Sequence, residues 1–386
     1  MGITTWDDQA QAIRRGLRPQ QGPQGRCLTV DGREVLNFCS NDYLGLAADP
    51  RLIEAATQAM AEEGFGSGAS RLVCGNMPAH QRLELTLARF KETEACVIFG
   101  SGYMANVGII SALFGPKDIV FSDRLNHASI IDGILLSRAT LKRYAHRDMT
   151  ALERLVRAHR QGRRRAVIVT DSVFSMDGDV APLEELTALA RRYDCAVMID
   201  EAHALGVLGR HGRGAAEHFG VEKAVDIHMG TLSKAAGAYG AYCCGSRALI
   251  DALVNRARSL IYTTGLPPAV AAAAARAVEI IRDDEALRQR LSRNTALARQ
   301  RIQAMGFDIG GSETPIIPLL VGDAAKACEF SRRLWEKGVW IKAICAPTVP
   351  VGTERLRLTV TAAHRPEDLE RLLEVLEETG RSLCLI

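Results

Sequence analysis

The sequence predicts an α/β protein in which a large domain contains a mostly parallel central sheet and a smaller α+β domain follows. Short, continuously apolar segments alternate with helical segments through the middle of the chain, as expected for strands that helices cover on both faces. A long helical region then separates these strands from a shorter α+β stretch. The length of 386 residues leaves room for both domains.

The elements are expected in a regular order after the first 45 residues, which are rich in Gly, Gln and Arg and show no regular pattern. The expected helices are Pro50–Glu63, His80–Phe90, Gly102–Leu113, Leu183–Tyr193, a continuous region from Pro268 to Met305, and Pro366–Glu378. The expected strands are Ala95–Phe99, Asp118–Phe121, Ala166–Thr170, Cys195–Ile199, Ala224–Met229, Tyr239–Cys244, Ile316–Leu320 and Leu356–Val360. This predicts an N-terminal segment of residues 1–45, a large domain of residues 46–285 and a small domain of residues 286–386.

Composition argues against several classes of function. The net charge is only +3, and the single basic run, Arg163 to Arg165, is typical of a solvated helix end, so we expect no nucleic-acid partner. No apolar run approaches the roughly 20 residues of a membrane span, and the start has no signal-peptide pattern. The ten cysteines and nine histidines form no metal-binding or disulfide pattern, so we expect a cytoplasmic protein without a metal site.

Lys234 is the first candidate for chemistry. It ends the segment Gly230 to Lys234, which directly follows an apolar strand and contains small residues that allow close approach of a ligand. In open parallel sheets, ligands bind beyond the carboxyl ends of the strands. A buried lysine there has a depressed pKa and can form a Schiff base as a nucleophilic amine. The alternative is a lysine in a solvent-facing loop.

Asp200 is the second candidate, because it ends the apolar strand before Lys234 and is followed closely by His203. A carboxylate at this position suits the protonated ring nitrogen of pyridoxal phosphate, which makes the ring an electron sink. The alternative is a capping aspartate at the start of a helix.

A glycine-rich turn between a strand and a helix provides a third candidate. Backbone N–H groups at the start of the helix, near Gly102 and Tyr103, predict an anion site. Gly100, Gly102 and Ala105 also fit a dinucleotide-binding pattern, with Asp123 about 20 residues further on. A nicotinamide-dependent dehydrogenase therefore remains an alternative, but it leaves Lys234 and Asp200 without a role.

Taken together, the motifs identify a family resemblance that covers nearly the whole chain. The sequence resembles the α-oxoamine synthases, acyl-CoA-dependent enzymes of fold type I among the pyridoxal-phosphate enzymes. The resemblance is carried by Leu36–Leu46 (LNFCSNDYLGL), Gly66–Leu72 (GSGASRL), Asp123–Ser129 (DRLNHAS), Ser172–Asp179 (SVFSMDGD), Asp200–His203 (DEAH), Gly230–Lys234 (GTLSK) and Pro347–Pro350 (PTVP).

The resemblance implies roles for the cofactor-binding residues. Lys234 would form the Schiff base with pyridoxal 5'-phosphate and take the α-proton of the substrate, and Asp200 would pair with the pyridine nitrogen. His127 would stack on the face of the ring, and His203 and Ser175 would contact the ring hydroxyl. The phosphate would be held by Gly102, Tyr103 and Thr231. On the residues alone, His127 is equally well a core or helix-capping histidine. Thr263 or Thr264 would reach the phosphate of a partner subunit, since the family's sites lie at a homodimer interface.

The resemblance also implies which residues bind substrate. Arg355 and Arg357 alternate with apolar residues on a strand, so their side chains share one face. Arg357 would hold the amino-acid carboxylate in the bidentate geometry that suits a guanidinium, assisted by Asn41. Arg15 and Thr348 would contact the acyl substrate, although Arg15 read alone fits a solvated helix arginine.

Within the family, the resemblance is strongest to the branch that serves biotin synthesis. This implies L-alanine as one substrate and a pimeloyl thioester, on CoA or a carrier protein, as the other. Sister enzymes that use glycine or serine with other acyl-CoA donors remain alternatives, as does a non-catalytic subunit of the same fold. Ala204 and Leu205, which follow the histidine where the family commonly has glycine, are expected to narrow the edge of the cofactor site.

Overall fold

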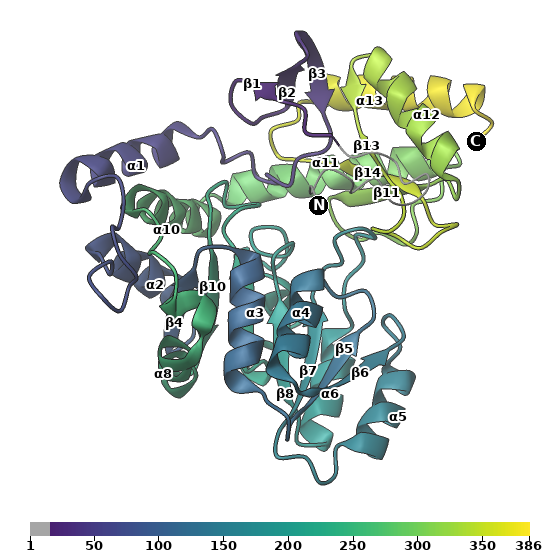
Figure 1. The fold of residues 1–386 in the computed structure, drawn as a ribbon. Coiled ribbons are helices and arrows are strands. Elements are labelled where there is room, and N and C mark those ends of the chain that lie inside the picture. Colours follow the sequence, from purple (N-terminus) through teal and green to yellow (C-terminus); the bar gives the residue numbers. More distant parts are fainter. Residues whose placement is uncertain (1–15) are drawn as a thin grey trace, which may run out of the picture.

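The structure, a computed structural model, describes residues 16–386 and is built around a seven-stranded sheet in the order β4-β10-β9-β8-β7-β5-β6 (Figure 1). Only β10 runs antiparallel to its neighbours, so the predicted mostly parallel sheet is confirmed. The strands are β4 (Ala95–Phe99), β5 (Ile119–Asp123), β6 (Thr140–Tyr144), β7 (Ala166–Asp171), β8 (Ala196–Asp200), β9 (Ile227–Thr231) and β10 (Ala241–Gly245).

Helices cover both faces of this sheet because successive strand residues point to opposite sides. In β4, Val97 and Phe99 join one apolar cluster, whereas Cys96 and Ile98 join another on the opposite face. The first cluster includes residues of α3 (Gly102–Leu113), α4 (Ala128–Ser137), α8 (Arg247–Arg256) and α9 (Arg258–Ile261). The second includes residues of α1 (Pro50–Glu63), α2 (Pro78–Phe90), α5 (Met149–His159), α6 (Leu183–Arg192), α7 (Ala215–His218) and α10 (Pro268–Asp283).

The C-terminal part forms a smaller α+β lobe with its own core around Phe330. Its three-stranded antiparallel sheet has the order β11-β14-β13. The elements are α11 (Glu285–Ala304), β11 (Ile316–Leu320), α12 (Ala324–Glu336), β12 (Val339–Trp340), β13 (Lys342–Ile344), β14 (Arg355–Thr359) and α13 (Pro366–Ser382).

The expectation that the N-terminal residues are irregular is wrong for the part that the structure describes. Strands β1 (Gln20–Gln21), β2 (Cys27–Val30) and β3 (Arg33–Asn37) form a sheet with β12, and Figure 1 shows them beside α13. Strand β3 pairs in parallel with β12, and Phe38 enters the core of the C-terminal lobe. Strands β2 and β3 form a hairpin around Asp31 and Gly32, a turn signal that the sequence analysis did not use. The pairing of β3 with β12, about 300 residues away, is the part that no local pattern reveals.

Other differences have local causes. The expected helix from Pro268 to Met305 is broken at Asp284, whose non-helical backbone and side chain cap the start of α11 by accepting from the Leu287 N–H. Edge strand β6 (TLKRY) is mostly half-buried, so it lacks the continuous apolar run of the central strands. Helices α4, α5, α8 and α12 were not expected from the sequence pattern.

The topology places three polar side chains at one edge of the sheet. Asp171, Asp200 and Thr231 are the last residues of the neighbouring strands β7, β8 and β9. Asp171 and Asp200 are direct register partners. Within residues 16–386, no helix is long and apolar enough to cross a membrane, and no cluster of side chains suits a metal ion.

Candidate active site

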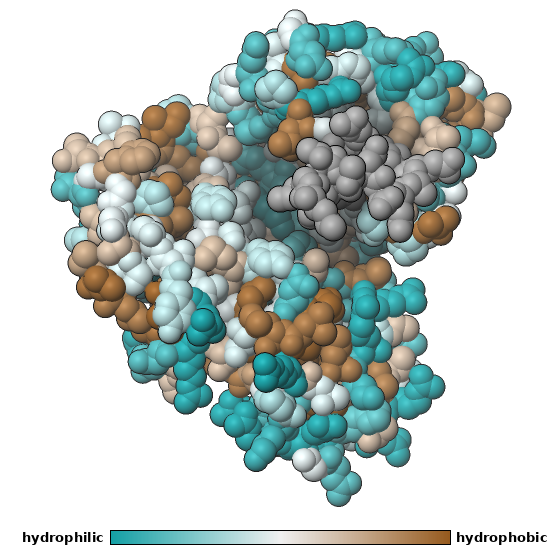
Figure 2. All heavy atoms as spheres, in the orientation of Figure 1, coloured by the Kyte–Doolittle hydropathy of each residue, from teal (hydrophilic) through white to brown (hydrophobic). Residues whose placement is uncertain are grey.

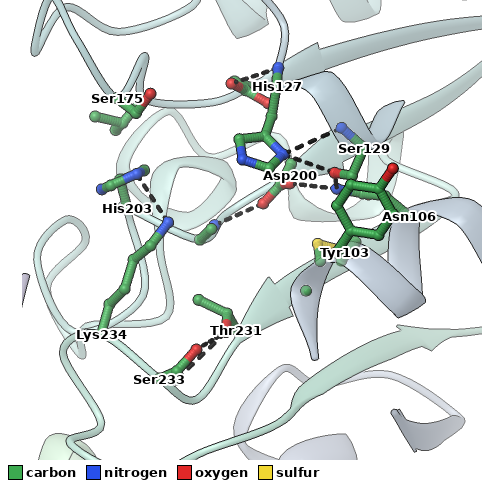
Figure 3. Close-up of a pocket in the computed structure, with 15 residues that line it drawn as sticks. Tyr103, Asn106, His127, Ser129, Ser175, Asp200, His203, Thr231, Ser233 and Lys234 are labelled. Carbon is green, nitrogen blue, oxygen red and sulfur yellow. Dashed lines mark hydrogen bonds between the residues drawn. The ribbon is translucent and has the colours of Figure 1, made fainter. Parts of the chain in front are cut away.

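A cavity of about 180 Å³ lies at this edge of the sheet, at the start of helices α3 and α4. Figure 3 shows Lys234 and His203 on one side of the cavity, with His127 beside Asp200 and Thr231 below them in this view. All eight residues that the sequence analysis assigned to the cofactor line this cavity: Gly102, Tyr103, His127, Ser175, Asp200, His203, Thr231 and Lys234.

Lys234 projects into the cavity from the turn after β9. The Leu232 N–H donates to the Gly240 carbonyl, and Gly237 adopts a positive φ of 61° that closes the turn. The Lys234 Nζ lies 2.8 Å from the His203 Nε2. Burial lowers the pKa of Lys234 to about 8, although the charges of Asp200 and Asp171 act in the opposite direction. The amine is therefore largely unprotonated above pH 8 and available as a nucleophile or base.

Asp200 is held by donors on both carboxylate oxygens. Its Oδ2 accepts from the Asn106 Nδ2 at 2.8 Å, and its Oδ1 accepts from the Ala202 N–H at 2.8 Å. Asn106 also donates to the Ser129 Oγ at 2.9 Å, which joins α3 to α4. These hydrogen bonds fix the direction of the carboxylate, which lines the cavity.

His127 is the N-cap residue of α4, so the alternative that it caps a helix is correct. Its Nδ1 lies 2.7 Å from the Ser129 Oγ, and its backbone N–H donates to the Asp171 Oδ2 at 3.2 Å. Burial lowers the pKa of the imidazole, with the Asp200 charge acting the other way, so the ring is neutral at pH 7. Capping fixes the ring at the wall of the cavity, where it can also serve a ligand.

The start of α3 forms an anion site at one end of the cavity. The Ser101 side chain caps the helix by accepting from the Met104 N–H at 3.2 Å. Gly102 and Tyr103, the first two helical residues, present N–H groups for which the helix has no carbonyl acceptor. The hydroxyls of Thr231 and Ser233, 2.6 Å apart, lie on the facing turn. This arrangement suits a phosphate group.

Arg355 and Arg357 are both buried, but they have different partners. The Arg355 Nη1 forms an ion pair with the Asp177 Oδ1 at 2.5 Å. The Arg357 Nε donates to the Ser175 carbonyl at 2.5 Å and its Nη1 donates to the Thr359 Oγ1 at 3.0 Å. Its buried Nη2 has no hydrogen-bond partner among residues 16–386. Arg357 therefore retains a donor for a ligand carboxylate, whereas Arg355 is neutralised.

None of the predicted substrate residues that the structure describes, Arg357, Asn41 and Thr348, is among the residues that line the cavity, although Arg357 contacts the lining residue Ser175. The Asn41 Oδ1 accepts from the Tyr43 hydroxyl at 3.4 Å, and that hydroxyl contacts His203. Thr348 lies in the segment between β13 and β14, and Thr263 and Thr264 follow α9. Arg15 lies outside the described residues.

Three residues of the site were not found from the sequence: Tyr43, Asn106 and Asp171. Asp171 ends a buried strand, which is the same signal that identified Asp200. Burial and the nearby Asp200 charge raise the pKa of Asp171 well above its usual range. Asn106 lies one turn after Gly102 on α3, but only the fold shows that it faces Asp200.

Ala204 and Leu205 do not narrow the cavity, contrary to expectation. Both are buried in the core on the α10 side of the sheet, and neither is among the cavity-lining residues. Asp123 does not line the cavity either. Its carboxylate accepts from the backbone N–H groups of Leu125 and Arg147, each at 2.9 Å. It is therefore poorly placed to serve the ribose of a dinucleotide.

A family model of class I and II aminotransferases matches residues 33–376. The chain belongs to the class I and II aminotransferase family. This membership, together with the relatives below, confirms the resemblance and the fold type I architecture that the sequence motifs predict. It also explains why the polar residues of the chain converge at the ends of β7, β8 and β9.

The curated relatives of this aminotransferase-family chain share a name. The 8-amino-7-oxononanoate synthase of Geobacter sulfurreducens is 54% identical over 378 residues, which cover 97% of this chain and 96% of that protein. The putative 8-amino-7-oxononanoate synthase of Geobacillus kaustophilus is 48% identical over 382 residues, which cover 99% of this chain and 97% of that protein.

Solved structures of the family have the same fold. A serine palmitoyltransferase with a pyridoxal phosphate internal aldimine has a TM-score of 0.93 and 30% identity, covering 96% of this chain and 94% of that one. The 8-amino-7-oxononanoate synthase of Francisella tularensis has a TM-score of 0.78 and 30% identity, covering 90% of this chain and 98% of that one.

The predicted cofactor, pyridoxal 5'-phosphate, is confirmed for this family member, and the cavity fits it. The fit rests on complementary chemistry at separate points of one cavity. Amide donors at the start of α3 suit the phosphate, the Asp200 carboxylate suits a protonated ring nitrogen, and the Lys234 amine suits the aldehyde.

Proposed function

We propose that this chain catalyses the condensation of L-alanine with a pimeloyl thioester, giving 8-amino-7-oxononanoate, the free thiol and CO₂ for biotin synthesis. One observation carries the reaction type: Lys234, with a pKa of about 8, faces the same cavity as the fixed carboxylate of Asp200. The choice of substrates is supported by the curated relatives, which are named for this product and are up to 54% identical over 378 residues.

The cofactor supplies one property that no side chain has. When bound, pyridoxal phosphate withdraws electrons from the α-carbon of the amino acid and stabilises negative charge there. Asp200, oriented by Asn106 and by the Ala202 N–H, holds a proton on the ring nitrogen. His127, His203 and Ser175 line the same cavity and would hold the ring when the cofactor is bound, His127 at its face and the other two at the hydroxyl edge.

Lys234 performs the proton transfer. Its neutral amine takes the α-proton of alanine and later returns a proton to the product carbon. Burial makes this possible near neutral pH, because it lowers the pKa of the amine to about 8. The surrounding histidines do not compete for the proton, since burial lowers the pKa of both His127 and His203.

Arg357 binds the carboxylate of alanine through its free Nη2, with Asn41 assisting. Its other two nitrogens are held by the Ser175 carbonyl and the Thr359 hydroxyl, so the guanidinium is fixed before substrate arrives. A fixed carboxylate orients first the C–H bond and then the C–CO₂ bond for cleavage. Thr348 and Arg15 contact the acyl chain, which arrives on CoA or on a carrier protein.

A homodimer in the cytoplasm is part of the proposal. Figure 2 shows hydrophobic side chains gathered over α4, where Leu135 and Leu136 are exposed on the same side of the molecule as the start of α3. Exposed apolar patches of this kind are typical of subunit interfaces. All ten cysteines are free, which suits a reducing compartment. Light scattering is expected to give twice the mass of one chain.

The direct test offers the purified, cofactor-saturated protein three amino acids with pimeloyl-CoA and measures release of thiol and CO₂. L-Alanine is expected to give product, and glycine and L-serine to give at most a small fraction of that rate. Replacing Lys234 by Ala should abolish turnover, and replacing Arg357 by Lys should raise the KM for alanine at least tenfold, because lysine lacks the planar guanidinium that Ser175 and Thr359 fix with Nη2 free for the carboxylate.

The control and the contrary outcomes are well defined. Arg381→Lys, at an exposed arginine on α13, should leave both kinetic constants unchanged. If the protein condenses L-serine with palmitoyl-CoA and does not use alanine, its activity is that of the serine palmitoyltransferases. Solved structures of those enzymes match this chain with TM-scores up to 0.93. Absence of turnover with every donor, in a protein that binds the cofactor, would refute the proposal.

A further inference from the structure

Tyr43 is a buried side chain that none of the steps above uses. It lies between β3 and α1 with only 1% of its surface exposed. Backbone bonds hold its position: the Tyr43 N–H donates to the Asn41 carbonyl at 2.8 Å, and the Ala362 N–H donates to the Tyr43 carbonyl at 2.7 Å. Its hydroxyl lies 2.6 Å from the His203 Nδ1.

His203 connects this hydroxyl to the reactive amine. Its Nε2 lies 2.8 Å from the Lys234 Nζ, so Tyr43, His203 and Lys234 form a continuous hydrogen-bonded chain. The charged groups that act on His203 are Lys234, Arg357 and His127, and all three disfavour a second proton on its ring, as does burial. His203 is therefore a neutral imidazole with one nitrogen protonated and the other an acceptor.

The geometry at the hydroxyl decides which nitrogen carries the proton. Tyr43 keeps its own proton, because burial raises its pKa to about 12. That proton has two acceptors, the His203 Nδ1 at 2.6 Å and the Asn41 Oδ1 at 3.4 Å. The first distance is that of a strong hydrogen bond, and the second is long for a hydroxyl donor. Tyr43 therefore donates to Nδ1, which leaves the imidazole proton on Nε2.

We propose that Tyr43 is a positioning residue that fixes the Nε2–H tautomer of His203, so that His203 donates to Lys234 and favours its unprotonated amine. The opposite tautomer would present a lone pair to Lys234 and would stabilise the ammonium form instead. The inference rests on the proposed function for the importance of the Lys234 amine. The tautomer itself follows from contacts within residues 41–234.

The first measurement needs neither substrate nor a variant. Nitrogen-15 NMR of histidine-labelled, full-length protein reports directly which ring nitrogen of His203 is protonated, and a His203→Gln sample assigns the signal. The inference expects the proton on Nε2 above about pH 8, where the Lys234 amine is largely unprotonated and can accept it. A proton on Nδ1 would overturn it, even if the protein condenses alanine as proposed.

The second measurement follows the consequence for Lys234. In Tyr43→Phe, the tautomer is expected to become mixed, and the pH midpoint for attachment of pyridoxal phosphate to Lys234, followed by absorbance, should rise by about one pH unit. Tyr144→Phe is the matched control, since Tyr144 is 2% exposed but ends β6 and is not among the cavity-lining residues. An unchanged midpoint in Tyr43→Phe, or an equal change in both variants, would show that Tyr43 has only a structural role.

Discussion

Asp200 illustrates how single residues of the site depend on partners from other elements. Its carboxylate lies at the end of β8, yet the side-chain donor that orients it comes from Asn106 on α3. Asn106 is 1% exposed, and its amide nitrogen divides its two donors between Asp200 and Ser129. A charged acceptor in a buried site gains more from such a donor than a neutral one does. Asn106 is therefore expected to support the cofactor through Asp200.

Replacing Asn106 by Ala should weaken pyridoxal phosphate binding about tenfold or more, because a hydrogen bond to a charged group contributes on the order of 1.5–3 kcal/mol. The measurement is the cofactor dissociation constant from an absorbance or fluorescence titration. Asn255→Ala serves as the control, since Asn255 is exposed on α8 and bonds only within its helix. A loss of thermal stability with unchanged cofactor affinity would contradict this role.

At the scale of elements, the segment from Phe174 to Asp179 joins the two lobes. It follows β7, carries Ser175 into the cavity and supplies Asp177 to Arg355 of the small lobe. The Gly178 carbonyl accepts from both the Glu313 N–H at 2.9 Å and the Thr314 hydroxyl at 2.9 Å. The position of Arg357 relative to Ser175 therefore depends on how closely this segment approaches β11.

Gly178→Ala should destabilise the protein and reduce turnover together. The φ of 71° disfavours a side chain, and a Cβ would overlap the Ile316 carbonyl oxygen and come within 2.9 Å of the Ser312 hydroxyl. We expect a loss of several kcal/mol in the free energy of unfolding, by the size of typical overpacking and strain effects.

Gly162→Ala is the matched control for this prediction. Gly162 has a similar φ of 78° but open space around it, so only the conformational cost of about 1–2 kcal/mol applies. Denaturant unfolding and kcat measured on both variants separate the two contributions. Equal losses in the two variants would mean that the close contact with β11 has no energetic consequence.

At the scale of the whole molecule, the contacts of His146 make the stability of the protein depend on pH. His146, in the connection between β6 and α5, contacts the Asp123 Oδ1 at 3.1 Å and the Asp179 Oδ2 at 2.8 Å. Burial alone would lower the pKa of His146, but these two carboxylates outweigh it and raise the pKa to about 9. Arg147 adds a second cation at Asp179 and reaches Glu313 in the small lobe.

The sign of the pH effect follows from linkage. The folded protein binds the His146 proton more tightly than the unfolded chain, whose histidine pKa is about 6.5. The stabilisation is complete below pH 6.5 and is lost as the pH rises through about 9, by on the order of 3 kcal/mol. His146→Gln should flatten this part of the profile of unfolding free energy against pH, whereas His218→Gln, at an exposed site, should not. A wild-type profile that is flat from pH 6 to 9.5 would rule out the coupling.

The sequence determined the parts of this protein that depend on local chemistry. Continuous apolar runs such as Ala166–Thr170 identify buried parallel strands, because both faces of such strands are covered. Polar residues placed directly after those runs, Asp200 and Lys234 among them, identify the ligand edge of the sheet, because parallel strands end on the same side. The eight residues that line the cavity as expected lie at strand ends, in the turns that follow these strands, or at helix starts.

Only the tertiary structure decided how distant segments meet. The hairpin of β2 and β3 joins the small lobe because β12 pairs with β3, and Asn106 acts on Asp200 because α3 packs across the sheet. Tyr43 reaches His203 from a position 160 residues earlier in the chain. Arg355 and Arg357 share a strand and a pattern, yet Asp177 neutralises one of them and leaves the other with a free donor. A local sequence pattern indicates the residue type and the helix or strand to which the residue belongs. A hydrogen bond across the fold also depends on a partner from a distant segment, which the local pattern does not contain.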